Sequence, residues 1–143
     1  GKKEEPVVVV APAPAPVATA SAPAAPAVAS NVIKIGHVGP TSGAIAHLGK
    51  DNENGAKMAV EEWNAKGVTI GGQKMTIELL AEDDAGDPKQ GTAVATKLVD
   101  AKVNGVIGHL NSGTSIPASK IYSDAGIPQI SAVFGGCTAG GAT

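Results

Sequence analysis

The chain has 143 residues, a formal net charge of -2 at pH 7 and 2% aromatic residues. This balance excludes the basic stripe of a nucleic-acid-binding protein, and so few aromatic rings exclude a base-stacking platform, so no nucleic-acid partner is expected. Cys137 is the only cysteine, which excludes an internal disulfide. No apolar run approaches the roughly 20 residues that a membrane-spanning helix needs.

Residues 1–30 are expected to form a disordered, extended linker. They are almost entirely Ala, Pro and Val behind a short charged start, and such a composition buries too little side-chain surface to offset its ordering entropy. Because the first residue is Gly rather than Met, we expect that an upstream segment has been removed. Two alternatives stay open: a cleaved signal peptide, or a lipid anchor on a cysteine directly ahead of Gly1.

From Asn31 onward the pattern predicts alternating strands and helices. A β-rich first strand over residues 32–38 ends at a Gly-Pro turn. A first helix is expected over residues 54–66, where apolar residues recur at helical spacing and Gly67 supplies the stop. The apolar face of this helix is expected to comprise Ala56, Ala59, Val60 and Trp63. A glycine pair then turns the chain into a second strand over residues 74–81.

The second helix has the clearest start in the sequence. Asp87 is placed to cap it, Pro88 suits its first position, and Gln90 can reach back to complete a capping box. Its buried stripe is expected to comprise Val94, Ala95, Leu98, Val99 and Ala101. A short third strand over residues 105–110 follows and is apolar enough to be covered on both faces.

The remaining pattern predicts a third helix over residues 116–125 and a fourth strand over residues 127–131. Strands separated by helices of this length indicate parallel βαβ units with right-handed crossovers. The predicted fold class is therefore α/β: a doubly wound, mostly parallel sheet with strand order 2-1-3-4, formed by residues 31–131. Residues 132–143 are rich in Gly and Ala and are expected to be a disordered tail.

Sheets of this kind bind ligands outside the carboxyl ends of their strands, where the strand order reverses. With the expected order, this crevice lies between strands one and three, flanked by the loops over residues 39–43 and 111–115. Both loops are small, hydroxyl-rich and contain glycine, and the second opens a helix, whose N-terminus favours a carboxylate or phosphate. The residues alone therefore predict a small anion-bearing ligand. Simple helix capping by Thr114 or Ser115 stays open as the alternative.

Two nucleotide-binding signatures fail. Gly36, Gly39 and Gly43 follow a strand, but their spacing is not that of the dinucleotide fingerprint. The stretch from Gly43 to Lys50 has five residues between its glycines, which is not the P-loop spacing, and Asp51 stands where a P-loop has Ser or Thr. No cofactor is predicted.

Metal binding and catalysis are also disfavoured. The histidines at positions 37, 47 and 109 share no metal-ligand spacing. The acidic run over residues 82–84 lacks the pattern of a calcium loop, so helix capping and solvation explain it better. Candidate nucleophiles are Ser42, Ser112 and Ser115, but none lies in a nucleophile elbow or has an evident acid–base partner. No metal site and no enzymatic activity are predicted.

Several stretches resemble the Leu/Ile/Val-binding family of periplasmic receptors. They are the first strand and loop over 35–43, the segments 64–67 and 82–90, and the segments 106–112 and 117–119. The resemblance covers roughly residues 32–131 with few gaps, and several of these stretches are specific to the family. Beyond Ser131 the chain departs from the family pattern, and we expect a truncated or frame-shifted product there.

This resemblance implies a receptor of two lobes that closes on an amino acid in the periplasm and delivers it to the permease subunits of an ABC importer. The chain would hold part of the first lobe, and an apolar edge and face of this incomplete sheet are therefore expected to be uncovered. In relatives, the serine matching Ser112 binds the carboxylate of the ligand, and Gly113 and Thr114 complete the same turn. The residue matching Leu48, which is often aromatic, lines the side-chain pocket.

The resemblance also bears on positions outside this turn. Val133 and Gly135 fall at further ligand-contact positions, and Gly135 lacks the hydroxyl of the threonine that is usual there. Some members carry a disulfide between the positions of Gly86 and Asn111, and it is absent here. Without a second lobe to close the cleft, we expect the chain to bind leucine weakly or not at all. An alternative function is a ligand-sensing regulatory domain of the same fold that binds amides or other small metabolites.

Overall fold

The computed structural model describes residues 31–131, so the expected linker and tail lie outside the described residues. The elements in this range are β1 (Val32–Gly39), α1 (Ala46–Lys66), β2 (Val68–Ile70), β3 (Gln73–Asp83), α2 (Pro88–Asp100), β4 (Gly105–Ile107), α3 (Ser112–Asp124) and β5 (Gln129–Ile130). They form a sheet of order β2-β3-β1-β4-β5, in which β1 pairs in parallel with β3 and β4, and β4 pairs in parallel with β5. The predicted α/β class and the order of the four parallel strands are confirmed.

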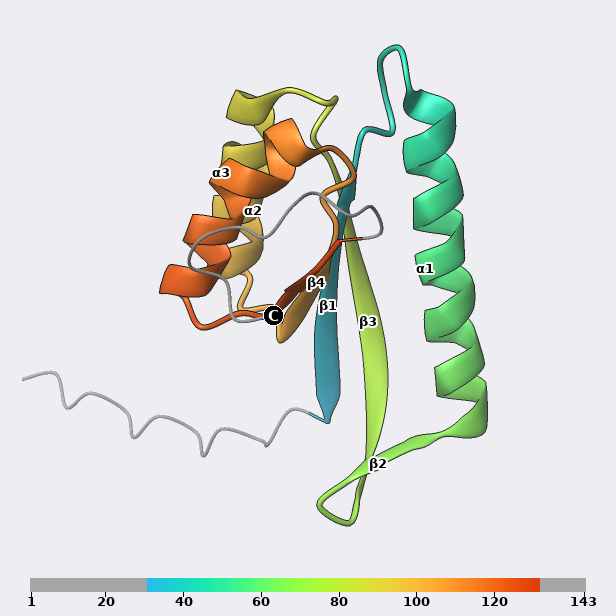
Figure 1. The fold of residues 1–143 in the computed structure, drawn as a ribbon. Helices are drawn as coiled ribbons and strands as arrows, with labels where there is room; N and C mark the ends of the chain where they lie inside the picture. The colour runs from blue at the N-terminus through green and yellow to red at the C-terminus, as the bar shows by residue number, and fades with distance from the viewer. Residues whose placement is uncertain (1–30, 132–143) are drawn as a thin grey trace, which may run out of the picture.

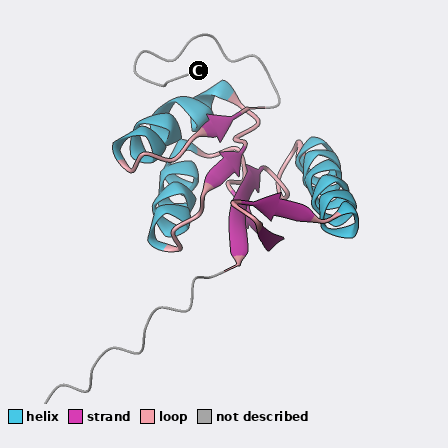
Figure 2. Cartoon of the chain, turned by 90° about the horizontal axis from the view of Figure 1, so that it is seen from below, coloured by secondary structure: helices cyan, strands magenta, loops and turns pink. Residues whose placement is uncertain are grey.

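The helices lie in two layers on opposite faces of the sheet (Figure 1). α2 and α3 pack together on one face, and α1 lies on the other, as the view from below in Figure 2 also shows. Because β1, β3 and β4 run in the same direction, the loops that follow them leave the sheet at its upper end in Figure 1. We call this the carboxyl end of the sheet. No helix among the described residues is long and apolar enough to cross a membrane.

The main core lies between the sheet and the α2–α3 layer. Side chains alternate between the two faces of a strand, so Gly36 and Val38 of β1 face this layer together. Gly36 leaves room for a helix side chain, because a Cβ atom at this position would lie 2.8 Å from the Leu98 Cδ1 atom. The buried residues of this core are Val38, Val94, Ala95, Leu98, Val103, Val106, Ala118 and Tyr122. Each large apolar side chain buried here stabilises the fold by about 1.5–3 kcal/mol.

The other face of the sheet is only partly covered. α1 packs on β1 and β3 and leaves a groove of about 410 Å³ beside it, lined almost entirely by apolar side chains. All four residues of the expected apolar face of α1 line this groove. Trp63 of α1 is 56% exposed, and Ile130 of β5 is 70% exposed. The expected uncovered apolar face is therefore present in the structure.

Two helices begin earlier than predicted. α1 begins at Ala46 rather than Asn54, because polar residues and a glycine in its first turns hide the helical pattern. That glycine, Gly49, has a packing role: a Cβ atom there would lie 2.2 Å from the Pro40 carbonyl oxygen. α3 likewise begins at Ser112 rather than at position 116. The short antiparallel strand β2, which pairs with β3, was not predicted.

The start of α2 is close to its prediction. Asp87 is the N-cap, its carboxylate accepts the amide N–H groups of Lys89 and Gln90 at 2.7 and 3.1 Å, and Pro88 is the first helical residue. The predicted capping box is wrong in one partner. The Gln90 side-chain amide donates to the Asp83 carbonyl at 3.4 Å, which draws the helix start toward the end of β3.

Two glycines of α1 give a matched test of its packing. We expect Gly49→Ala to lower the free energy of unfolding by about 1–3 kcal/mol, because the new methyl group meets backbone that cannot move aside. Gly55→Ala has no atom within 4 Å of its new methyl group. It should raise the free energy by about 0.5–1 kcal/mol through helix propensity alone. Urea unfolding followed by circular dichroism measures both, and equal effects would contradict the proposed contact.

Candidate functional site

The candidate site lies at the carboxyl end of the sheet, at the turn that opens α3. Asn111 is the N-cap residue in extended conformation, and Ser112 and Gly113 are exposed in the first turn. The first amide N–H groups of a helix have no acceptor within it, and the helix dipole adds partial positive charge at this end. The turn therefore presents free amide donors and one hydroxyl to solvent, at the end of the sheet where the crevice between β1 and β4 was predicted.

The next two residues face the interior. Thr114 is fully buried, and its hydroxyl donates to the Asn111 carbonyl at 3.0 Å. The Ser115 hydroxyl donates to the His109 carbonyl, also at 3.0 Å. Neither side chain caps the helix, since both donate to carbonyls ahead of it, and Asn111 makes no side-chain capping bond. The alternative of simple capping by Thr114 or Ser115 is therefore wrong, and the exposed surface of the turn belongs to Ser112 and Gly113.

The other predicted site residues are placed less completely. Leu48 lies in the first turn of α1, at the same end of the sheet, with 44% of its surface exposed. Val133 and Gly135 lie outside the described residues. Gly86 and Asn111 are close neighbours, since a Cβ atom at Gly86 would lie 3.5 Å from the Asn111 Nδ2 atom.

Asp83 holds the loop between β1 and α1. Its carboxylate accepts the amide N–H groups of Thr41, Ser42 and Ala85 at 2.9, 3.3 and 2.8 Å, and it also accepts the Ser42 hydroxyl. Burial acts to raise the pKa of Asp83, but the hydrogen bonds from Ser42, Ala85 and Thr41 outweigh it and hold the pKa below its ordinary value. The Ser42 hydroxyl is therefore engaged within the protein.

A buried polar chain joins the ends of β3 and β4 to α3. His109 Nδ1 lies 2.8 Å from Asp84 Oδ2, and His109 Nε2 lies 3.0 Å from the Tyr122 hydroxyl. Asp84 and His109 are 0% exposed and Tyr122 is 1% exposed. Burial acts to raise the pKa of Asp84, but hydrogen bonds from His109 and the Gly86 amide lower it below its ordinary value. Burial and the nearby Asp84 charge raise the pKa of Tyr122 far above its ordinary value, so its hydroxyl keeps its proton.

The backbone ahead of the turn is held equally closely. The His109 carbonyl accepts the hydroxyls of Ser115 and Ser131 at 3.0 and 2.9 Å, and the Gly108 amide donates to the Ile130 carbonyl at 2.8 Å. Gly108 has a φ of 127°, and a Cβ atom there would lie 2.1 Å from the Val38 carbonyl oxygen. Only glycine fits this close approach between β4 and β1.

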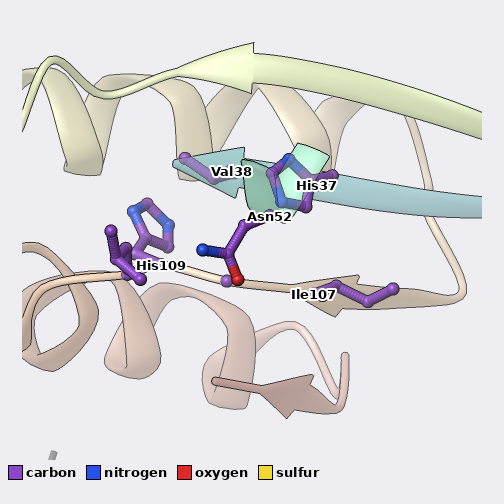
Figure 3. Close-up of a pocket in the computed structure, with 7 residues that line it drawn as sticks. His37, Val38, Asn52, Ile107 and His109 are labelled. Atoms are coloured by element: carbon purple, nitrogen blue, oxygen red, sulfur yellow. The ribbon is translucent and has the colours of Figure 1, made fainter. Parts of the chain in front are cut away.

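A small hollow of about 10 Å³ lies beneath this region, between β1, α1 and the end of β4. Figure 3 shows His37, Asn52 and His109 around it. Among the buried side-chain polar atoms of the described residues, His37 Nδ1 and Asn111 Oδ1 are the two without a hydrogen-bond partner. Burial lowers the pKa of His37 below 6.5, so the ring is held in its neutral form.

Sequence reasoning missed the residues that support the turn. The acidic run was expected to cap a helix and be solvated, but Asp84 is fully buried, and that expectation is wrong for it. His109 and Tyr122 were not expected to contact it. The only available signal was the acidic run over residues 82–84, which directly follows the predicted second strand at the edge where the other parallel strands also end.

Known proteins share much of this sequence and its fold. The profile of the periplasmic binding protein family matches residues 32–143. The leucine-specific-binding protein of Salmonella typhimurium is 46% identical over 99 residues, which cover 69% of this chain and 26% of that protein. The Leu/Ile/Val-binding protein of Escherichia coli strain K12 is 47% identical over 98 residues, covering 68% of this chain and 26% of that protein. The chain thus spans about a quarter of the length of the curated relatives it matches.

Solved structures agree with these relatives. The branched-chain amino acid transporter substrate binding protein LivJ of Streptococcus pneumoniae, in complex with isoleucine, has a TM-score of 0.64 and 37% identity, covering 70% of this chain and 28% of that one. An ABC-transporter solute binding protein of R. palustris, in complex with benzoate, has a TM-score of 0.60 and 31% identity, covering 70% and 27%. The fold is thus that of a lobe of a solute-binding protein. The profile match over residues 32–143 shows that the chain belongs to the periplasmic binding protein family.

The buried histidine makes stability depend on pH. As pH falls below 6.5 the unfolded chain binds a proton at His37 before the folded chain does, so the free energy of unfolding should fall, with a slope of up to about 1.4 kcal/mol per pH unit. His37→Leu should remove this part of the slope. His47→Ala, at an exposed position of α1, should not. Urea unfolding on both sides of pH 6.5 tests this, and identical slopes for wild type and His37→Leu would contradict it.

Proposed function

We propose that this chain forms part of the ligand-binding lobe of an extracytoplasmic receptor, which captures a branched-chain or similar amino acid for an ABC importer. The observation that carries the proposal is the exposed turn at Ser112 and Gly113, at the start of α3 and at the reversal point of the strand order. Two relatives are named for binding leucine or Leu/Ile/Val, and two of the solved structures are complexes with isoleucine and benzoate. All of these ligands carry a carboxylate, the group that a helix N-terminus favours.

In this proposal the amides of Ser112 and Gly113 and the Ser112 hydroxyl bind the ligand carboxylate. A hydrogen bond to a charged group contributes about 1.5–3 kcal/mol. Thr114 would support the turn from behind, because its side chain is buried and both its amide and its hydroxyl donate to the Asn111 carbonyl. Leu48 supplies an exposed apolar surface for the ligand side chain, and Val133 and Gly135 are proposed as further lining. The protein would act without enzymatic turnover and without a cofactor.

The proposed partners follow from the family. The receptor would deliver its ligand to membrane permease subunits from the periplasm, and it would be exported either by a cleaved signal peptide or with a lipid anchor that tethers it to the membrane. In this proposal the chain carries the carboxylate half of the site, and its match covers 26% of the leucine-specific-binding protein. Only a small part of the binding free energy of a closed cleft is therefore expected from the isolated chain.

A chimera tests the proposed contact in a complete receptor. Residues 32–131 would replace the matching segment of the leucine-specific-binding protein of Salmonella typhimurium, to which this chain is 46% identical. We expect the chimera to bind leucine and Ser112→Ala to weaken binding by about 10- to 100-fold, because a charge-assisted hydrogen bond is lost. Isothermal titration calorimetry measures both.

The controls separate this contact from general damage. Ser119→Ala changes a hydroxyl on the same helix that donates to the Ile116 carbonyl, so leucine affinity should not change. Leucinamide, which lacks the carboxylate, should bind the chimera far more weakly than leucine does. Equal leucine affinity for Ser112→Ala and the unchanged chimera would refute the proposed role of the turn.

A further inference from the structure

The buried chain of Asp84, His109 and Tyr122 lies directly behind the exposed turn. We propose that these three residues form a positioning device that fixes the Ser112–Gly113 turn for ligand binding, with His109 as its central residue. None of the three reaches the surface, so each would act on the ligand through the turn. The link to binding rests on the function proposed above, whereas the effect on the turn itself does not.

The His109 ring cannot rotate while Asp84 and Tyr122 both bond to it. With Asp84 ionised, His109 Nδ1 carries a proton and donates to the carboxylate at 2.8 Å. In the neutral imidazole, Nε2 then accepts the Tyr122 hydroxyl at 3.0 Å. The ring is thus held from both sides, by the end of β3 and by the middle of α3. A ring with both nitrogens bonded also fixes the backbone of its own residue.

The backbone of His109 lies close to the Ser112–Gly113 turn. His109 lies three positions before Ser112, and its carbonyl accepts two hydroxyls, one from α3 and one from the residue after β5. The Asn111 carbonyl accepts the Thr114 hydroxyl and the Thr114 and Ser115 amides. The residues on both sides of the exposed turn are therefore fixed by interior hydrogen bonds.

Burying the charged Asp84 side chain has a free-energy cost. Burying a charged pair costs hydration free energy, and well-packed apolar residues of similar volume often stabilise a fold as well as, or better than, such a pair. Apart from Tyr122, the neighbouring core cluster consists of Val, Ala and Leu side chains. A polar chain at this one place is therefore poorly explained by stability alone. Fixing one orientation of the adjoining loop accounts for it, because a hydrogen bond specifies direction and apolar packing does not.

Tyr122→Phe tests the device in the 143-residue chain, because it removes one hydroxyl and keeps the buried ring. The measurement is the backbone order parameter from nitrogen-15 relaxation. At Ser112 and Gly113 it should fall from about 0.85, typical of rigid backbone, to below about 0.6. Val94→Ala, which trims the same core without touching a polar group, should leave these values unchanged.

The same variants are then placed in the leucine-binding chimera. Tyr122→Phe should weaken leucine binding about tenfold, equivalent to about 1.4 kcal/mol, and Val94→Ala should not. Ser112→Ala should weaken binding while the order parameter of Gly113 stays at its wild-type value. This contrast distinguishes a contact residue from a positioning residue, and loss of stability alone would not produce it.

The outcomes are distinguishable. Unchanged order parameters at the turn in Tyr122→Phe would overturn the positioning role, and a loosened turn with unchanged leucine affinity would overturn its link to binding. A chimera that fails to bind leucine at all would refute the proposed function, while the order parameters still decide the positioning role. If Tyr122→Phe loses its dispersed core signals, His109→Gln, which keeps one side-chain donor, replaces it in the same measurement.

Discussion

The buried pair of Asp84 and His109 is the constraint on which the carboxyl end of the sheet depends. β3 and β4 lie on opposite sides of β1, so a hydrogen bond between residues at their ends spans the strand between them. Removing one partner of such a pair leaves an uncompensated buried group and costs about 3–5 kcal/mol. The pair therefore fixes the distance between the β3–α2 and β4–α3 loops, which lie on either side of β1.

The adjacent carboxylates of Asp83 and Asp84 hold different loops at the carboxyl end of the sheet. Successive residues of a strand point to opposite sides, and at the end of β3 this places Asp83 toward the β1–α1 loop and Asp84 toward His109. Asp83 fixes Thr41 and Ser42, while Asp84 fixes the backbone that leads to Ser112. One dipeptide thus couples the two loops that flank the crevice. Helix capping, which is the role of Asp87, is separate from both.

Much of the fold could be predicted from local patterns, and the support of the site could not. Apolar spacing, turn residues and the Asp87-Pro88 start identified the parallel strands, their order and the exposed turn. The start of α1 was not predicted because glycine is required at position 49 by a close contact with Pro40. No local sequence pattern indicates this contact. The pairing of Asp84 with His109 joins positions 25 residues apart. The local sequence does not distinguish Asp84 from a solvated acidic residue or His109 from a loop residue. Only the packed structure therefore identifies the pair.

The two faces of the sheet have unequal roles in this arrangement. The α1 face is open beside β4 and β5, with Trp63 and Ile130 largely exposed. Every described hydrogen bond that fixes the β4–α3 turn comes from the ends of β3 and β5 or from α3, and none comes from α1. Leu48 is the one predicted site residue carried by α1. The turn proposed to bind the ligand carboxylate therefore depends on the closed α2–α3 layer. The proposed side-chain pocket depends on the helix whose packing is less complete, so under this proposal changes in that packing would alter ligand selectivity before they altered carboxylate binding.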